Sequence, residues 1–463
     1  MNRRVVASGV VPGRGGRQWK ARENEMTKTP TWQRLALAGA LLLSVAGMAA
    51  ASTITVPNGI AGGTCGAGNV NERQFGGNCG SLVTVTADQA PAYVQDNSPA
   101  AEATYRVRFY VNLAGKASTV PGTTGATYPS NLLTMSSGNA FDLFAAYDGA
   151  DPVPPATAGN KAFRIEAGYN GTDYTITGYI RNDAGSETAT STVVIKRGFR
   201  SIEAEWAKST ASGNNTGKLN LWIDGTVATG VSAVDVDTSS VNYVRWGAVD
   251  GLEAATSGTF KIDDFVSQRE NYIGPAVPFS DVPSSDSFYR AVQSTYQSEI
   301  IPASGAGTFG PTGVVTRKEM AKFLLTSKDS TAYNPPACVT ATFSDVPCSH
   351  PYANWIYELV ARGITAGCGA GIYCPENPTT RRQMVVFIQK TNGVSLPAAC
   401  TADPFLDVPM ADSFCPWIKR AVDTNLTTGC GGGNFCPMTN VNRAQMSVFL
   451  RKEFVLPFIA VGP

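Results

Sequence analysis

The front half of the chain alternates apolar and polar residues with a period of two. The runs SLVTVT from Ser81, TYRVRFYVNL from Thr104 and KLNLWIDG from Lys218 show the pattern most clearly. β-Branched and aromatic residues fill these runs, and Gly, Asn and Asp separate them, as in antiparallel strands. About nine or ten such runs at short spacing predict an all-β antiparallel sandwich or barrel.

The back half changes to helical periodicity. Met320, Phe323 and Leu324 lie at i, i+3 and i+4, which places them on one face of a helix. Met384 with Phe387 and Ile388, and Met446 with Phe449 and Leu450, repeat the stripe. Each stripe follows a capping-box pattern that begins at Thr316, Thr380 or Asn442. A second apolar helix is predicted before each of them, within 288–301, 354–364 and 416–426.

The helical half is one unit repeated three times. Each unit opens with F-x-D-V, at 279–282, 343–346 and 405–408. Asp281, Asp345 and Asp407 are 64 and 62 residues apart, as are Arg317, Arg381 and Arg443. A fixed period predicts repeats that bury a shared core. The predicted organisation is a sandwich over 52–272, a linker over 273–278, and repeats over 279–337, 338–399 and 400–463.

The first 51 residues form a signal peptide region. Lys28 and Arg34 precede an apolar run from Leu35 to Met48, and three alanines then supply small cleavage-site residues. This run of 14 residues is short against the ~20 of a membrane span, although an uncleaved anchor is the alternative. Met26 would be a more ordinary start for such a signal. The pattern predicts an exported protein whose mature chain has no transmembrane segment.

Composition narrows the possible functions. Without residues 1–51 the chain keeps 29 basic and 34 acidic residues, so this mildly acidic protein has no electrostatic footprint for nucleic acid. A single histidine, His350, argues against most histidine-based catalysis and against a His-rich metal centre.

The ten cysteines agree with export. They suggest local disulfides, which the spacing places at Cys65–Cys79, Cys338–Cys348, Cys368–Cys374, Cys400–Cys415 and Cys430–Cys436. The first repeat has no cysteine and carries Ser304 and Gly310 at two of the matching positions. Zinc binding is the alternative, but an exported chain without paired C-x-x-C knuckles favours disulfides. Sequence alone does not prove the connectivity.

Candidate chemistry in the front half is sparse. Glu203 and Glu205 share one strand face and are the best carboxylate pair for glycoside hydrolysis, although a solvated outer face explains them as well. Asp263 and Asp264 are a possible calcium site, with an ordinary strand end as the alternative. Trp222 could stack on a sugar or pack as a partly buried residue.

Three segments of the front half resemble a known fold. They are GKLNLWIDG at 217–225, VRWG at 244–247 and SGTFKIDDF at 257–265. Together they resemble the back half of a laminin-G-like, concanavalin-type jelly roll, and the resemblance extends over roughly residues 100–272. Such sandwiches include lectins, adhesion modules and glycan-cleaving enzymes, so the resemblance implies a fold and leaves the function open.

The three repeats resemble the S-layer homology family. The F-x-D-V step, the aromatic helix, a loop ending at Pro311, Pro375 or Pro437, and the polar–Arg helix start all occur in order three times. The resemblance implies a pseudo-threefold prism that tethers an exported protein non-covalently to cell-wall polysaccharide, often one bearing a pyruvate ketal. The binding sites would be the grooves between repeats.

The same resemblance suggests site residues. It implies that the three repeat arginines offer a charged fork to a carboxylate at a helix N-terminus. A first-turn arginine is expected to project outward. Other positions of the family motif complete the suggested set: Arg317, Arg381, Arg443, Asp281, Asp345, Asp407, Trp355 and Trp417. The alternatives are that the aspartates hold turns and that the tryptophans are core residues.

These observations favour an exported, non-catalytic bacterial cell-surface protein. The repeats would bind envelope polysaccharide, and the sandwich would bind glycan or protein ligands; no cofactor other than a possible calcium ion is expected. One alternative is an envelope-anchored enzyme acting on extracellular polysaccharide. The other is a structural subunit of a surface layer.

Overall fold

The computed structural model describes residues 53–55, 81–86, 89–97, 99–113, 133–149, 160–196, 198–269, 271–305, 307–329 and 333–459. The predicted signal peptide region and the predicted pair Cys65–Cys79 lie outside the described residues. No helix in these ranges combines the length and the apolar character needed to cross a membrane.

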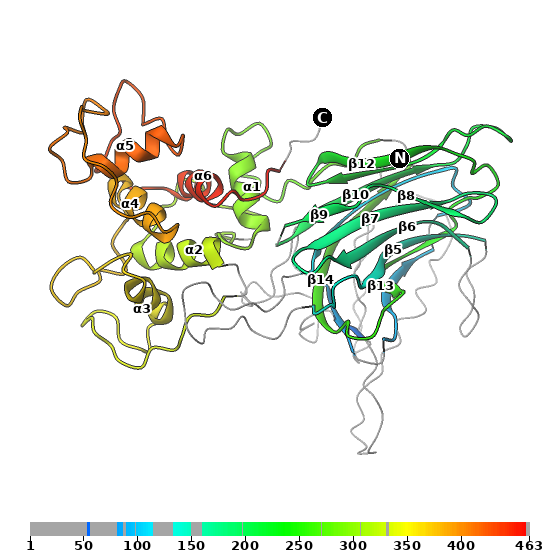
Figure 1. Cartoon of the computed structure of the whole chain (residues 1–463), viewed down its shortest axis with the longest axis horizontal. Helices are drawn as coiled ribbons and strands as arrows, with labels where there is room; N and C mark the ends of the chain where they lie inside the picture. The colour runs from blue at the N-terminus through cyan, green and yellow to red at the C-terminus, as the bar shows by residue number, and fades with distance from the viewer. Residues whose placement is uncertain are drawn as a thin grey trace, which may run out of the picture.

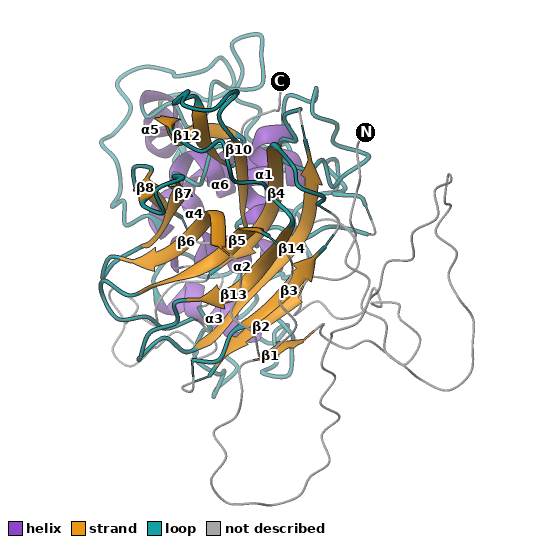
Figure 2. Ribbon diagram, turned by 90° about the vertical axis from the view of Figure 1, so that its right-hand side faces the viewer, coloured by secondary structure: helices purple, strands orange, loops and turns teal. Residues whose placement is uncertain are grey.

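Two antiparallel sheets make up the front half (Figures 1 and 2). The first sheet has seven strands, in the order β1 (Thr53–Thr55), β2 (Ser81–Val85), β14 (Gly258–Gln268), β4 (Thr104–Asn112), β10 (Arg200–Ala207), β11 (Gly217–Ile223) and β12 (Thr226–Val234). The second follows β3 (Ala92–Asp96), β13 (Tyr243–Asp250), β5 (Ala140–Asp148), β6 (Asn160–Tyr169), β7 (Tyr174–Arg181) and β8 (Glu187–Ala189), and β9 (Val193–Ile195) also pairs with β7. The prediction of an antiparallel sandwich is confirmed.

The sandwich core follows from the alternation read in the sequence. Leu219 and Leu221 of β11 are fully buried, whereas Asn220 between them points to the other face. Trp206 of β10 stacks on Phe163 of β6, with ring centroids 6.1 Å apart, so aromatic rings join the two sheets. The apolar side chains that face the opposite sheet therefore hold the two sheets together.

The I-D-G segment makes the hairpin that its sequence predicts. Asp224 and Gly225 connect β11 to β12 with φ angles of 53° and 79°, the left-handed geometry that suits a tight β-hairpin. The late D-D-F strand, β14, lies inside the first sheet between β2 and β4.

In the part of the back half that the structure describes, the helices form three pairs (Figure 1). They are α1 (Tyr289–Gln297), α2 (Arg317–Asp329), α3 (Ala353–Ala361), α4 (Arg381–Thr391), α5 (Cys415–Asp423) and α6 (Arg443–Glu453). The second helix of each pair starts at the repeat arginine, as predicted. The capping boxes are present: Thr316 N–H donates to Glu319, and Asn442 exchanges hydrogen bonds with Gln445.

The three repeats close into a ring. Val315 N–H donates to the carbonyl of Val441, Val441 N–H to that of Thr379, and Thr379 N–H to that of Val315. The second helix of each repeat packs on the first helix of the next, in the pairs α2 with α3, α4 with α5 and α6 with α1. One hydrophobic core runs through all three repeats. This is the pseudo-threefold arrangement that the resemblance implies.

Four predicted disulfides are present: Cys338–Cys348, Cys368–Cys374, Cys400–Cys415 and Cys430–Cys436. The second bond of repeats two and three closes the loop before the second helix. Cys374 and Cys436 adopt left-handed φ angles of 60°, and the matching residue of repeat one, Gly310, has a φ of 67°. The three loops thus share one backbone shape.

This equivalence predicts that the double variant Ser304→Cys, Gly310→Cys forms a third disulfide. A Cβ placed on Gly310 would lie 3.1 Å from the Cβ of Ser304, close enough for a bond after a small adjustment. A loop of this length should stabilise the repeats by about 2–3 kcal/mol. Thiol titration and thermal unfolding with and without reductant would check it. Two free thiols in the oxidised double variant would contradict the prediction, and Ser304→Ala is the control.

Candidate functional site

Each of the three repeat arginines reaches across to a loop of the next repeat. Arg317 Nε donates to the carbonyl of Tyr373 at 2.9 Å, so the arginine of repeat one reaches the aromatic loop of repeat two. Arg381 bonds Phe435 in the same way, and Arg443 bonds Phe309, which closes the cycle. Each guanidinium also lies 4.7–4.8 Å from the centre of the aromatic ring of the residue whose carbonyl it binds.

The expectation that these arginines project outward is wrong. The three arginines are only 3–9% exposed, because the loop of the next repeat covers each helix start. The loop carbonyls also take the first helical N–H groups: Arg317 N–H donates to Asn377 and Lys318 N–H to Pro375. Burial lowers the pKa of all three guanidinium groups. These helix starts are therefore contacts between repeats, not open anion sites.

A direct role for the arginines in glycan binding remains a prediction. Nη2 of Arg317 and of Arg381 is buried and has no hydrogen-bond partner. Nη2 of Arg443 instead donates to the carbonyl of Pro302. The three arginines thus make the same contact through Nε and differ in the contacts of Nη2.

The aspartates of the F-x-D-V steps hold the loops. Asp345 accepts the backbone N–H groups of Tyr373 and Cys374 at 2.9 and 2.7 Å. Asp281 and Asp407 bind the matching pairs of N–H groups in the other two repeats. Since both carboxylate oxygens are used, this geometry corresponds to the turn-holding alternative.

The two tryptophans occupy different surroundings. Trp355 is partly buried between repeats one and two, with its ring 6.1 Å from that of Tyr333 and Lys322 Nζ 5.8 Å from its centre. Trp417 is buried between repeats two and three, where its carbonyl accepts a hydrogen bond from Gln389. Trp417 lines a hollow there.

That hollow has a volume of ≈ 650 Å³. Its lining comes from α4, from the segment after α4, from the start of α5 and from the residues that follow α3. The lining residues are Arg362, Gly363, Val386, Lys390, Gly393, Val394, Ser395, Leu396, Ser413, Phe414 and Trp417. No acidic side chain is among these residues. Lys390 Nζ donates to the carbonyl of Gly363, while Arg362 is neutralised by Glu358 and Asp329 at 2.7 and 2.5 Å.

A second hollow, of ≈ 370 Å³, lies on the outer face of the second sheet. Its charged lining residues are Asp142, Lys161, Arg164, Glu166, Glu187, Asp250 and Glu253. Asp142 of β5 stands opposite Glu166 of β6, and Arg164 Nη1 binds both carboxylates, at 2.7 and 2.8 Å. Like charges facing each other across strands are destabilising unless cations hold them.

Sequence reasoning missed this group. Alternation in K-A-F-R-I-E at 161–166 shows that Arg164 and Glu166 share a face, but it assigns Lys161 to the opposite one. The partners Asp142, Glu187 and Asp250 come from other strands, β5, β8 and β13. Hydrogen bonds to Glu187 and Glu166 raise the pKa of Arg164 despite its burial. Desolvation would raise the pKa of Asp250, but its bond to Lys161 outweighs this and lowers it. Both groups therefore stay charged at neutral pH.

Glu203 is neither solvated nor free. It is 2% exposed, and its carboxylate accepts from Arg106 and from the backbone N–H groups of Ile273 and Gly274. The interpretation of this face as a solvated one is therefore wrong, because the linker covers it. Glu205 binds Lys218, Asn220 and Arg106, which lower its pKa against the effect of desolvation.

Trp222 packs against Tyr272, the residue just before the linker. Its ring lies 4.6 Å from the Arg106 guanidinium and 5.8 Å from the ring of Tyr272. Trp222 is partly buried, so its position agrees with the packing alternative.

The sandwich and repeat one also touch directly. Phe199 N–H donates to the carbonyl of Gln297 at 2.7 Å, and Lys261 lies 3.5 Å from Glu299. Together with the linker bound at Glu203, these contacts join the two halves.

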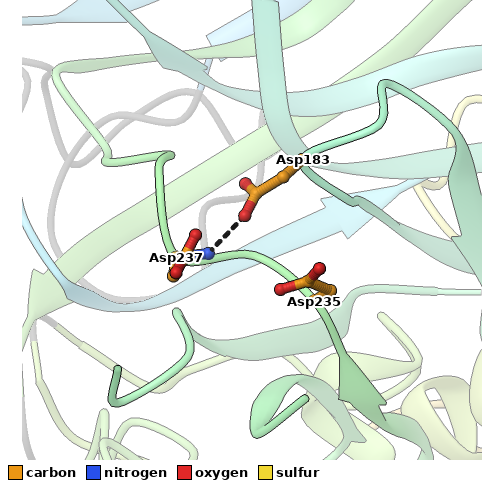
Figure 3. Close-up of side chains that lie close together, drawn as sticks. All are labelled: Asp183, Asp235 and Asp237. Atoms are coloured by element: carbon orange, nitrogen blue, oxygen red, sulfur yellow. Dashed lines mark hydrogen bonds between the residues drawn. The ribbon is translucent and has the colours of Figure 1, made fainter. Parts of the chain in front are cut away.

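Among the described residues, two groups of carboxylates are candidate cation ligands. Asp264, from the predicted calcium pair, forms an ion pair with Arg108 at 2.8 Å, and Asp263 accepts the N–H of Asp264. Asp183, Asp235 and Asp237 bring carboxylate oxygens within 4.8 Å of one another (Figure 3). Asp183 already accepts from the backbone of Asp237 and from Thr238, so this cluster fastens two loops together. Calcium binding at Asp263 and Asp264 remains a prediction.

The protein thus has two parts: an antiparallel sandwich, and a module of three helical repeats that close into a ring. Residues 278–321 and 342–385 match the S-layer homology domain, so the chain carries S-layer homology domains. These domains indicate anchoring at the bacterial cell surface. The third repeat lies outside the matched residues, and its kinship with the other two rests on the shared sequence motifs and on the ring geometry.

Two curated relatives match parts of the chain. A cell surface protein of Thermoanaerobacter kivui is 32% identical over 114 residues, which is 24% of this chain and 15% of that protein. An endoglucanase of Bacillus sp. (strain KSM-635) is 27% identical over 180 residues, 37% of this chain and 18% of that protein. The chain thus spans less than a fifth of the length of either relative.

Solved structures overlap the chain only loosely. The receptor-binding domain of botulinum neurotoxin type G has a TM-score of 0.27 at 11% identity and covers 42% of this chain and 40% of its own. The serotype D ligand-binding domain, in complex with N-acetylneuraminic acid, has a TM-score of 0.24 at 10% identity, with 43% and 38% covered. At these TM-scores the likenesses carry no weight for the sandwich's fold or function.

Proposed function

We propose that this chain is an exported protein held non-covalently on bacterial envelope polysaccharide by its three repeats, with the sandwich displayed outward. The observation that carries the proposal is the pair of S-layer homology matches in repeats one and two. The closed backbone ring supports extending the assignment to repeat three, because each repeat contributes the same contacts.

We further propose that the anchoring polysaccharide is acidic, with a pyruvate ketal as its carboxylate-bearing group. Support comes from the hollow between repeats two and three, whose lining has basic side chains and no acidic one. An ammonium group facing a carboxylate there would form a charge-assisted hydrogen bond.

Binding to protein-free cell walls tests the anchoring role. The repeats and the sandwich have separate hydrophobic cores, so residues 273–463 and 52–272 can be compared with the whole chain. We expect the whole chain and the repeats to sediment with walls carrying pyruvate ketals. Walls stripped of the ketal by mild acid are the control and should bind much less. Sedimentation of the sandwich alone would reverse the assignment of roles.

For the sandwich we propose ligand binding without catalysis. A glycosidase needs one carboxyl group that stays protonated as the acid. In the outer-face hollow, Asp142, Glu166 and Asp250 are each bonded to Lys161 or Arg164. Desolvation alone would raise the pKa of Asp250, but Lys161 lowers it, so this carboxyl group is a poor proton donor. This supports a binding role for glycan or protein ligands.

An anchored glycosidase is the second candidate. One observation favours it: Asp142 and Glu166 stand opposite each other on neighbouring strands and bind a single nitrogen of Arg164, and retaining enzymes likewise use two carboxyl groups held near each other. Hydrolysis of a polysaccharide panel by the purified chain, abolished in Asp142→Asn and in Glu166→Gln, would establish this candidate. Ordered two-dimensional arrays of purified protein would instead favour a structural layer subunit.

A further inference from the structure

The outer-face hollow of the sandwich, with its volume of ≈ 370 Å³, carries more negative than positive charge. Two cations line it, Lys161 and Arg164. The lining residues with a carboxylate outnumber them: Asp142, Glu166, Glu187, Asp250 and Glu253. Side chains of these types are charged at neutral pH. The hollow therefore has a surplus of three negative charges.

The surplus charge lies where solvent reaches it. Lys161 and Arg164 are partly buried, and both bind Asp142, whose side chain is 5% exposed. The side chain of Asp250, in contrast, is 59% exposed. Glu253 is exposed as well, and it takes part in no ion pair among the described residues. A ligand that enters from solvent therefore meets carboxylates before it meets the cations.

These two exposed carboxylates have a fixed backbone behind them. Asp250 is the last residue of β13. Glu253 Oε1 accepts the backbone N–H of Ala140, the first residue of β5, at 3.2 Å. Asn139 Nδ2 donates to the carbonyl of Ala254, which fastens the same turn a second time. Because the acceptors are held in place before a ligand arrives, less conformational entropy is lost on binding.

The cations of the hollow argue against a metal ion as its ligand. Lys161 Nζ lies 2.6 Å from Asp142 and 2.7 Å from Asp250, so an ammonium group already bridges these carboxylates. A calcium ion would need several oxygen ligands free of such a cation. Among the described residues, the group of three carboxylates with oxygens within 4.8 Å of one another consists of other residues: Asp183, Asp235 and Asp237.

The hollow also lacks the apolar and aromatic surface of a typical small-molecule site. Phe141 is part of the lining, but it is buried and its ring packs on Phe260 in the sandwich core, with centroids 5.6 Å apart. The nearby ring of Tyr179 is covered by the Arg164 guanidinium, 3.7 Å from its centre. A charged side chain of a larger partner suits this lining better than a sugar ring, because the partner can bind around the hollow as well as in it.

We propose that the outer-face hollow is the docking site for a protein partner that inserts a lysine or arginine side chain, and that Asp250 and Glu253 bind its cationic group. The inference rests on the proposed ligand-binding role of the sandwich and names the class of ligand. Hydrogen bonds between ionised groups are about twice as strong as neutral ones. The surplus negative charge also attracts a basic partner during encounter.

Saturation-transfer NMR on the whole chain tests the inference. The probes are the capped peptides Gly-Gly-Arg-Gly-Gly and Gly-Gly-Lys-Gly-Gly. The same peptides with citrulline or norleucine at the central position are the ligand controls, since they keep the shape and lose the charge. We expect the charged peptides to bind and the neutral ones not to bind. Affinity should fall as salt is raised from about 0.1 M to about 1 M, because the screening length shrinks from about 10 Å to about 3 Å.

A pair of double variants locates the binding. Asp250→Asn with Glu253→Gln should weaken binding of the charged peptides about fivefold or more, because two exposed ion pairs are lost. Asp235→Asn with Asp237→Asn removes the same charge from the other acidic group and should bind like the wild type. Circular dichroism would check that both double variants are folded.

Three results would overturn the inference. They are a failure of both charged peptides to bind, equal binding of the charged and neutral peptides, and an equal loss of affinity in the two double variants. The last result would show that net charge alone attracts the peptides.

A glycan array separates failure of the inference from failure of the proposed function. A glycan that the whole chain binds less well after Asp250→Asn with Glu253→Gln would leave ligand binding at the hollow standing and make the class of ligand wrong. If neither a peptide nor a glycan shows this dependence, the proposed ligand-binding role of the hollow fails too. Sedimentation with cell walls still tests the anchoring role separately.

Discussion

Replacing Glu203 by alanine is expected to lower the free energy of unfolding of the sandwich by about 3–5 kcal/mol, because it breaks a buried ion pair. The change would leave Arg106 as a charge that is only 7% exposed, with the weaker Glu205 contact as its remaining ion pair. It would also remove the acceptor of two linker N–H groups, those of Ile273 and Gly274. Urea unfolding followed by tryptophan fluorescence would measure the loss.

Glu205→Ala is the matched control. Glu205 lies on the same strand face and also contacts Arg106, but its side chain is 22% exposed and its other ionic partner, Lys218, is 39% exposed. Its loss should cost at most about 1 kcal/mol. Limited proteolysis gives a second readout, since releasing the linker should expose residues 273–278 to cleavage in the Glu203 variant only. Equal stability of the two variants would refute the assigned role of Glu203.

Replacing Arg381 by methionine should destabilise the whole repeat module by about 2–4 kcal/mol, the combined effect of a lost charged hydrogen bond and a lost cation–π contact. Arg381 reaches from repeat two to the carbonyl and ring of Phe435 in repeat three. Because one core is shared by all three repeats, the loss should appear as a single shifted transition. Differential scanning calorimetry of residues 273–463 would measure it.

Lys419→Met serves as the control for that variant. Lys419 forms an exposed ion pair with Asp423 within α5, which is worth about 1 kcal/mol or less. If one repeat of the Arg381 variant unfolded in a separate, earlier thermal transition, the three repeats would not unfold cooperatively. An unchanged unfolding temperature would show that the interrepeat contact of Arg381 does not stabilise the module.

Much of the local structure was readable from the residues. The i, i+3, i+4 stripe at Met320 and the capping pair Thr316–Glu319 place α2 where it begins, because both signals act within a few residues of chain. The loop cysteines were readable for the same reason: Cys368 and Cys374 bracket a short loop and meet in a disulfide. The prediction that Arg317 lies in the first turn of a helix was also correct, but the prediction that its side chain projects outward was wrong.

The direction of Arg317 depends on a neighbour 56 residues away, since the loop carrying Tyr373 comes down over the helix start. Glu203 is a similar case: strand alternation shows which face it takes, and only the path of the linker shows that this face is covered. The charged group around Arg164 was missed because Asp142 and Glu187 come from other strands. Exposure and ion pairing depend on non-local packing, which no window of sequence contains.

The sequence by itself determined the repeat, its period, the helix starts and the alternation of the strands. These features depend on the spacing of nearby residues, and that spacing recurs along the chain. Only the tertiary structure decided that the three junctions between repeats differ. Phe458 and Leu396 occupy matching positions in the sequence, yet one lies against two arginines and the other stands beside a hollow. The physical reason is that a junction forms between two repeats, so its shape depends on side chains that meet only when the ring closes.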